Sequence, residues 1–436
     1  MQQQSRAADV VMLGLGDVRV LGATEVDGEV ELSIETTATR EWCRGCGVRA
    51  RSKGRAETLV RDTDAFGRPA RLRVRKRRWR CPEPLCATKT WTEQITAVAP
   101  RAVLTERARR DACLRVGRDG DSVAEVARAY GTGWHTIMAA VRAHGRPLVD
   151  DPARLADVTA LGMDETSWLR ANRDHHTLYV SGLVDTASGR LLDVVADRTA
   201  RAVAGWLARQ APEWLARIGV VSLDPHRGYA NAVGLHLSHA VLVVDHFHLI
   251  QLANRVIDDV RRRTQQATLG HRGRKPDPLY RVRKLLLKAC QALDVRGWAR
   301  LADALAAGDP DGQVTAAWQL KEITRDLYRA ATVDQARQTL ELLYAWADTS
   351  NIPELRRFAG TVRRWEHEIL NYHRTGGVSN GPTEAVNLAV KQIKRVGRGF
   401  TNLHNYRLRL LLHCGGVNWH TQPAARLRGR GPQIAA

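Results

Sequence analysis

Three short apolar runs that each end in an aspartate constrain this chain more than any other feature. VTALGMD ends in Asp164, GVVSLD in Asp224 and AVLVVD in Asp245. Such a run is typical of a buried strand, and a carboxylate at its end is held rigidly at the rim of a sheet. Two unpaired carboxylates about 4 Å apart repel by roughly 4 kcal/mol at an effective dielectric of about 20. The pattern therefore predicts one acidic site on one sheet, with a divalent cation among its carboxylates.

The order of expected elements around these aspartates predicts an α/β fold. The expected elements are strands over 158–164, 176–184 and 190–196, a helix over 199–217, a strand over 219–224, a short helix after 226–228 and a strand over 240–244. Three strands, a helix, a strand, a helix and a strand is the order of an RNase H-like domain. Such a domain places acids from its first and fourth strands side by side.

Length and charge limit the class of protein. The chain has 436 residues, which suggests two to four domains, and a formal net charge of +21. This excess favours a nucleic-acid partner, because each phosphate contact releases counterions; the alternative is a basic surface that faces only solvent. No apolar run approaches the roughly 20 residues that cross a bilayer, and the N-terminus lacks the features of a secretory signal. We expect a cytoplasmic protein that associates with the bacterial nucleoid and has no membrane contact.

The N-terminal part predicts a β hairpin and a zinc site. Apolar and polar residues alternate over 18–34 around Asp27-Gly28, which is a hairpin signal. Cys43 and Cys46 form one close pair and Cys81 and Cys86 a second. Two such pairs supply the four thiolates of a structural Zn²⁺ site, although the second pair has four intervening residues rather than the common two. The alternative is four unrelated free cysteines.

The stretch between the cysteine pairs is strongly basic. RLRVRKRRWR, at 71–80, reads as a strand with one basic face. We expect phosphate contacts from Arg73, Arg75, Lys76, Arg77 and Arg78, against the alternative of a charged edge that discourages aggregation. The ring of Trp79 would stack on a base or pack beside the metal.

Residues 101–150 predict a helix-turn-helix. One helix has apolar residues at i, i+3, i+4 and i+7 from Val123, Gly131-Thr132-Gly133 breaks it, and a second begins at Trp134 with the same spacing. A further helix near 103–117 would complete a three-helix unit. A helical hairpin of this kind can lay its second helix in the major groove, but ordinary helical hairpins share the pattern. His135, Thr136 and Arg142 are the outward-facing candidates.

Four longer motifs resemble a known family. GMDET, SLDPHRGYANAV, VVDHFHLIQLAN and NGPTEAVNLAVKQIKRVGRGFTNLHNYRLRLLL are similar to the DDE transposases of bacterial insertion sequences, above all the ISL-three group. The likeness covers nearly the whole chain in the right order. It implies that Asp164, Asp224 and Glu384 are the catalytic triad. It also implies a cysteine-rich finger and a helix-turn-helix before an RNase H-like core.

The residues around Glu384 agree with that role. Glu384 lies in the first turn of a helix that opens after Asn380-Gly381-Pro382, where the helix dipole favours a carboxylate. Lys391 falls on the same face at i+7, and we expect it and Lys394 to contact DNA. The alternative for Glu384 is a helix-capping acid. Asp245 competes with Asp224 for the second position, and we expect it and His248 to organise the site or to make a structural contact.

The expected chemistry is two-metal catalysis. Three carboxylates can hold two Mg²⁺ or Mn²⁺ ions with phosphate oxygens and water. Such a site cuts at an element end and joins that end to target DNA without a covalent enzyme intermediate.

The expected domains follow from these features. They are a β hairpin and zinc-finger module at 1–98, a helix-turn-helix at 99–150, the first part of the core at 151–245, an all-helical insertion at 246–379, the final core helices at 380–418 and a basic tail at 419–436. Within the insertion we expect helices from 249 and over 279–293, 312–331, 334–348 and 354–372, and a polar loop over 264–278. Trp298, Trp318, Trp346 and Trp365 are expected in its core.

The sequence thus predicts a transposase that binds the terminal inverted repeats of its insertion sequence as double-stranded DNA, as a homo-oligomer. Two alternatives stay open. One is a non-catalytic DNA-binding regulator derived from a transposase, and the other is a metal-dependent site-specific nuclease.

Overall fold

A computed structural model describes residues 14–15 and 18–420. Contacts divide the chain into two compact units, Leu155–Ala389 and Met1–Arg154 with Val390–Ala436. Residues 390–418 therefore group with the N-terminal residues, whereas we expected them in the core domain. The expected domain boundaries stay a prediction. The expected basic tail lies, from residue 421 on, outside the described residues.

A five-stranded sheet forms much of the first unit. Its strands are β1 (Val18–Val26), β2 (Glu29–Thr36), β3 (Arg51–Ala65), β4 (Arg68–Arg80) and β5 (Thr90–Thr92), in the order β1-β2-β4-β3 with β5 beside β4. Asp27 and Gly28 both have positive φ, which gives the tight hairpin between β1 and β2 that Asp-Gly predicts. The sequence pattern did not predict β3. Its residues are mostly polar, and its pairing with β4 across the turn at Phe66-Gly67 specifies the strand.

Helices complete this unit. They are α2 (Glu106–Gly117), α3 (Val123–Ala129), α4 (Trp134–Val149), a short 3-10 helix (Pro152–Leu155) and α17 (Leu403–Cys414). The three helices expected for the helix-turn-helix unit are therefore present. A capping box between Ser122 and Glu125 begins α3. α17 packs against α2 and α4.

A second five-stranded sheet carries the predicted acids. Its strands are β6 (Ala160–Leu169), β7 (Leu178–Asp185), β8 (Arg190–Ala196), β9 (Val220–Leu223) and β10 (Val241–Val244), in the order β10-β9-β6-β7-β8. β6, β9 and β10 are parallel, and β7 is antiparallel to β6 and to β8. The order of strands along the chain is the expected one. β6, however, continues five residues beyond Asp164, because these residues pair with β7 as far as Leu178.

Three helices accompany this sheet, namely α5 (Ala200–Leu207), α6 (Pro212–Arg217) and α7 (Arg227–His236). The single helix expected over 199–217 is wrong, because Pro212 begins a new helix at its first turn. Buried side chains of these helices, among them Val203, Trp206 and Tyr229, belong to the same core as Leu161 and Leu223 of the sheet.

The insertion is all-helical, as expected. Its helices are α8 (His246–Leu269), α9 (Pro278–Arg281), α10 (Arg283–Leu287), a short 3-10 helix (Cys290–Ala292), α11 (Val295–Gly308), α12 (Gln313–Leu327), α13 (Val333–Thr349), α14 (Pro353–Arg364) and α15 (Glu366–Arg374). α16 (Gly381–Val396) follows. The sequence pattern did not predict α11. It also placed a loop from residue 264, whereas α8 continues to Leu269 with Thr264 and Gln265 buried.

The tryptophans of the insertion differ in burial. Trp365 is buried, and Trp318 and Trp346 pack against the core, but Trp298 is 41% exposed. The core prediction is therefore wrong for Trp298. Among the described residues, no helix has the length and apolar character needed to cross a bilayer.

Candidate active site and nucleic-acid interface

Asp164 lies in the interior of β6 with only 8% of its surface exposed. The amide of Asn387 on α16 donates a hydrogen bond to its Oδ2, and the backbone N–H of Glu165 donates to Oδ1 at 2.6 Å. Burial, together with the charges of Asp224 and Glu384, raises the pKa of Asp164 to about 7. The carboxyl group therefore lies within electrostatic reach of both other expected acids.

Asp224 and Asp245 follow adjacent parallel strands, β9 and β10, and share one histidine. His248 Nδ1 lies 2.8 Å from Asp224 Oδ1 and 3.1 Å from Asp245 Oδ2. Burial lowers the pKa of His248, but these two hydrogen bonds outweigh it and raise the pKa to about 10. The raised pKa favours the protonated imidazolium, in which Nδ1–H donates toward both carboxylates.

Asp245 is 1% exposed and caps α8, since its side chain accepts the backbone N–H of His248. The backbone N–H of Asn380 donates to its other oxygen at 3.0 Å. Burial raises the pKa of Asp245, but the bonds from His248 and Asn380 bring it below the usual value. The three side chains of Asp224, Asp245 and His248 could also be read as metal ligands on distance alone. The contacts of His248 Nδ1 with both aspartates, at 2.8 and 3.1 Å, also fit a hydrogen-bonded cluster.

Glu384 lies in the first turn of α16, as the Asn-Gly-Pro motif predicts, and is only partly buried. Its Oε1 is 3.8 Å from His248 Nε2, so His248 lies between Glu384 and Asp224. The structure therefore brings together Asp164, Asp224, Glu384, Asp245 and His248.

Asn380, which the sequence analysis did not select, connects these groups. It is completely buried, and its amide donates to the carbonyl oxygen of Met163 at 3.2 Å and to Asp224 Oδ1 at 3.4 Å. Its backbone carbonyl accepts the N–H of Glu384 at 3.1 Å. Its backbone N–H also donates to Asp245. Asn380 therefore contacts Asp224, Asp245 and Glu384, and through Met163 the residue next to Asp164.

Gly162 allows α16 to approach β6 closely. A Cβ atom at this position would lie 2.2 Å from Thr383 Oγ1 and 2.9 Å from Asn380 Oδ1. Both of those side chains are buried. The absence of a side chain at residue 162 therefore sets where the first turn of α16, and with it Glu384, lies. The sequence shows a glycine two positions before Asp164. Its role becomes apparent only from its contacts with Thr383 and Asn380.

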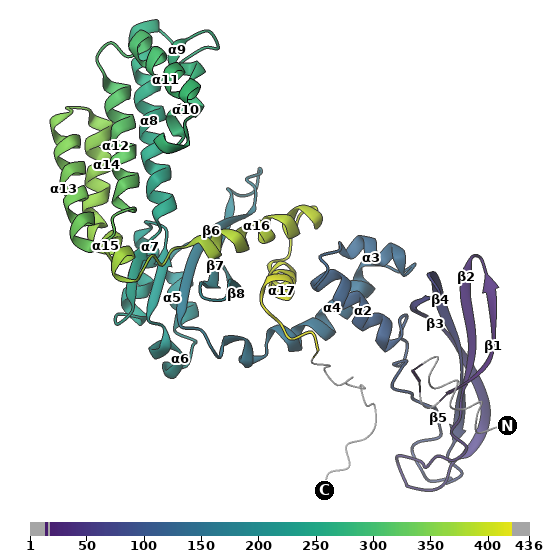
Figure 1. The fold of residues 1–436 in the computed structure, drawn as a ribbon. Helices are drawn as coiled ribbons and strands as arrows, with labels where there is room; N and C mark the ends of the chain where they lie inside the picture. Colours follow the sequence, from purple (N-terminus) through teal and green to yellow (C-terminus); the bar gives the residue numbers. More distant parts are fainter. Residues whose placement is uncertain (1–13, 16–17, 421–436) are drawn as a thin grey trace. The chain divides into compact units, whose positions relative to one another are not determined.

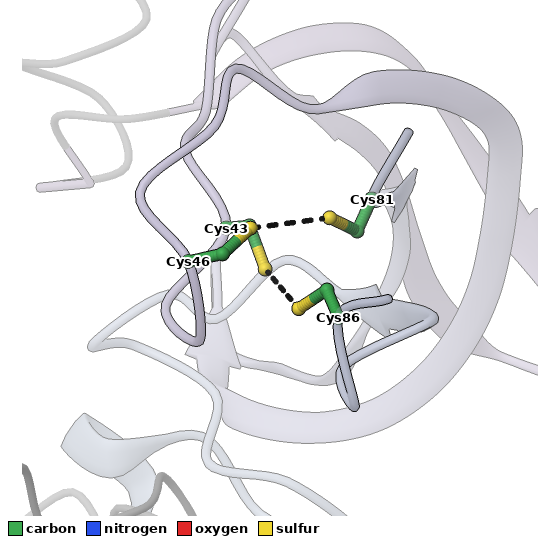
Figure 2. A group of neighbouring side chains, drawn as sticks. All are labelled: Cys43, Cys46, Cys81 and Cys86. Carbon is green, nitrogen blue, oxygen red and sulfur yellow. Dashed lines mark hydrogen bonds between the residues drawn. The ribbon is translucent and has the colours of Figure 1, made fainter. Parts of the chain in front are cut away.

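The four expected cysteines of the first unit form a compact cluster (Figure 2). Cys43 and Cys86 sulfur atoms are 3.6 Å apart, and those of Cys46 and Cys81 are 3.5 Å apart. Around a tetrahedral zinc with Zn–S bonds of about 2.3 Å, sulfur atoms lie about 3.8 Å apart. Burial raises the pKa of Cys43, but the backbone N–H groups of Gly45 and Cys46 bring it down to about 7. This donor set fits structural zinc.

The basic strand is less available to DNA than its sequence suggests. Lys76 was wrongly expected to contact phosphate, because it is 6% exposed and its ammonium donates to the Val98 carbonyl. Arg73 pairs with Glu31 and Glu57, and Arg75 with Glu57. Acids on β2 and β3 therefore neutralise part of the face.

Three neighbours on β4 differ in their environments. Arg77 donates to the hydroxyl of Ser52, and Arg78 is exposed. Trp79 is buried rather than open to a base.

The helix-turn-helix candidates also differ in exposure. His135 is exposed, and its ring lies edge-on to Trp134. Thr136 is half-buried. Arg142 was expected to face outward, but it is half-buried and its Nε donates to Asn405 on α17 at 3.0 Å. On α16, Lys391 is exposed and Lys394 is half-buried.

Sequence comparisons agree with this organisation. A family model described as a transposase of the ISL3 type matches residues 161–410. A model of the zinc finger of the IS204/IS1001/IS1096/IS1165 transposases matches 39–86, and a model of the helix-turn-helix domain of transposase family ISL3 matches 93–145.

Individual relatives are also transposases. The transposase of insertion sequence element IS1001 from Bordetella parapertussis is 26% identical over 405 residues, which cover 91% of this chain and 94% of the relative. Transposases of IS1557 from two strains of Mycobacterium tuberculosis are 26% identical over 313 residues, which cover 66% of this chain and 67% of each relative. Since the transposase model covers more than half of the residues and the two DNA-binding models precede it in order, this chain belongs to the ISL3 family of transposases.

Proposed function

We propose that this transposase binds the terminal inverted repeats of its insertion sequence and catalyses DNA cleavage and strand transfer in an RNase H-like domain. The sheet order β10-β9-β6-β7-β8 supports that fold. β7 pairs antiparallel with β6 and with β8, and β9 pairs parallel with β6 and with β10. The observation that carries the proposal is the convergence of Asp164, Asp224 and Glu384. They come from a strand, a strand end and a helix that lie far apart in the sequence.

Asp164, Asp224 and Glu384 would hold two Mg²⁺ or Mn²⁺ ions. Carboxylate oxygens are the ligands that these hard cations prefer. Burial first, and then the charges of Asp224 and Glu384, raise the pKa of Asp164, and a bound cation would offset the repulsion among these carboxylates. When bound, the ions supply Lewis-acid stabilisation of the leaving oxygen and a lower pKa for the attacking hydroxyl.

The protein groups around the acids orient them. Asn387 holds Asp164, and the imidazolium of His248 holds Asp224 against Asp245. In this proposal Asp245 and His248 are organising residues and do not contact the substrate. The exposed side chain of Lys391, seven residues after Glu384, would contact a DNA phosphate, and Lys394 would assist it.

The first unit would recognise the element ends. The zinc-finger region at 39–86 would present Arg77 and Arg78 to the phosphate backbone, and α4 would present His135 and Thr136 to the major groove. Pairing of two element ends before strand transfer would require a homo-oligomer on DNA.

Asp164→Asn tests this division of labour. We expect it to abolish Mg²⁺-dependent cleavage of a duplex that carries the element end and to leave binding of that duplex intact. Cleavage is read from labelled strands on a denaturing gel and binding from a mobility shift. The duplex comes from the DNA beside the reading frame, where inverted repeats bounded by short direct repeats should lie. Loss of binding together with cleavage would contradict the proposal.

A further inference from the structure

The end of the helical insertion carries a concentration of positive charge that the proposed active site does not use. Residues 270–300 contain nine Lys or Arg and two Asp, with no Glu. Eight of the nine are exposed and form what we call the tip patch: Arg272, Arg274, Lys275, Arg281, Lys284, Lys288, Arg296 and Arg300. The ninth, Arg283, is half-buried and stacks on Tyr280.

The tip patch lacks the carboxylate partners found elsewhere. On the sheet of the first unit, Arg71 and Arg73 pair with glutamates of β2. Within the described part of the chain, none of the eight tip-patch residues forms an ion pair. The two aspartates of the segment are engaged locally, since Asp277 accepts the backbone N–H of Arg274 and Asp294 caps α11. The positive charge is therefore available to a polyanion.

Two of these residues share a cavity of about 310 Å³ between α9 and α11. Arg281 and Arg300 line it, above apolar walls that include Val282 and Ala304. Asp303 also lines the cavity, yet neither arginine pairs with it. Two guanidinium groups over a shallow hollow suit a phosphate group, which they can bind through paired N–H donors.

The position of the tip patch is fixed by one helix. α8 begins beside Asp245 and continues unbroken for 24 residues to Leu269, where the tip begins (Figure 1). At about 1.5 Å per residue its length is about 36 Å. Duplex DNA rises about 3.4 Å per base pair, so the same distance spans about 10 base pairs, or one helical turn.

We propose that the tip patch binds the phosphate backbone of the duplex held at the acidic cluster, about one helical turn from the phosphate that is cut. This inference rests on the proposed function for the position of that phosphate. Exposed arginine and lysine without base-reading partners give contacts that do not depend on sequence. The insertion thus acts as a support for DNA outside the region read by the first unit.

The test compares the full-length protein with the variant Arg281→Gln/Arg300→Gln. The probe is a duplex with the inverted repeat and about 30 base pairs of flanking DNA, about three helical turns. We expect hydroxyl-radical protection about 10 base pairs from the cut phosphate, and its loss in the variant alone. The slope of log affinity against log salt should fall by about 2, since each phosphate contact contributes about 0.9.

The matched control is Arg329→Gln/Arg337→Gln, which removes the same charge from exposed arginines that pair with Asp326 and Asp334. It should leave both the protection and the slope unchanged. Unaltered protection in the tip variant, or an equal change in both variants, would overturn the inference. If the wild-type protein does not cleave this duplex with Mg²⁺, the proposed function fails, while the salt slope still reports whether the tip patch binds DNA.

Discussion

Asn380 shows how one uncharged residue can hold several acids in place. Its side-chain amide and backbone groups bond to Met163, Asp224, Asp245 and Glu384. We predict that Asn380→Ala slows cleavage at least about tenfold, or about 1.4 kcal/mol, and raises the Mg²⁺ concentration needed for half the maximal rate. End binding should not change.

Asn371→Ala is the matched control for this residue. Asn371 is also buried, and its amide donates to a strand carbonyl, that of Leu242, but it touches none of the acids. Both variants should lose about 1–3 kcal/mol of stability, measured by thermal unfolding. An equal Mg²⁺ requirement in the two variants would show that Asn380 has only a structural role.

A second prediction at this scale concerns pH. The pKa of Asp164 is about 7 in the folded protein and about 3.9 in the unfolded chain. The folded state therefore binds the extra proton between these values, and stability falls as pH rises from about 4 to about 7. Without metal at pH 8, Asp164→Asn should be more stable than wild type by roughly 1–3 kcal/mol. The Asn387 amide can turn its oxygen toward the new NH₂ group, so the replacement leaves no two donors facing each other. Denaturant unfolding at pH 4 and pH 8 measures this, and a wild-type advantage at pH 8 would contradict the shift.

The sequence predicts the acidic residues of the site better than the residues that position them. Asp224 and Asp245 follow apolar strands, and Glu384 follows a helix-start motif, so local patterns reveal them. Asn380 and Gly162 act through contacts between segments distant in sequence, which no local pattern encodes. The predictions for Arg142 and Lys76 depend on distant segments as well, since Asn405 on α17 binds the half-buried Arg142 and the Val98 carbonyl binds the buried Lys76.

At the scale of elements, the contact between β6 and α16 is the critical one. We predict that Gly162→Ala forces Thr383 and the first turn of α16 away from the sheet, with a stability cost of about 1–3 kcal/mol and a loss of cleavage of at least about tenfold, or about 1.4 kcal/mol. Gly182→Ala on the paired strand β7 is the control, because its nearest contacts would lie at an ordinary 3.8 Å. Equal cleavage rates for the two variants would refute the packing argument.

Helices and strands with a clear apolar period were predicted from the sequence. Those that depend on pairing or packing with distant segments were missed. α3, α4 and β8 agree with the expected ranges. β3 is mostly polar and depends on its ladder with β4. The end of α8 is polar as well, and its buried Gln265 accepts a hydrogen bond from Arg261 and donates one to Asp277. Strand ends are uncertain for a related reason, as the extension of β6 depends on β7.

At the scale of the whole molecule, the two compact units predict separable functions. Cys46→Ser should remove zinc and weaken end binding toward the non-specific level, about a thousandfold. Thermal stabilisation by Mg²⁺ should remain, because the acids lie in the other unit. Metal analysis and calorimetry check this. Cys290→Ser, at a half-buried cysteine outside the cluster, should change neither property, and loss of the Mg²⁺ response in Cys46→Ser would show that the units do not act separately.

The hydrogen bonds that hold Asp245 have a consequence for mutational screens. Both of its oxygens accept N–H groups, one from Asn380 and the other from His248. The side chain of Asp245→Asn has the same shape but must turn its NH₂ group toward one of those N–H donors. The two donors then repel each other, and Asp245→Ala avoids this repulsion. A screen should therefore rank asparagine below alanine here. That inverted ranking would identify a scaffold carboxylate among residues that a loss-of-activity assay alone would classify as catalytic.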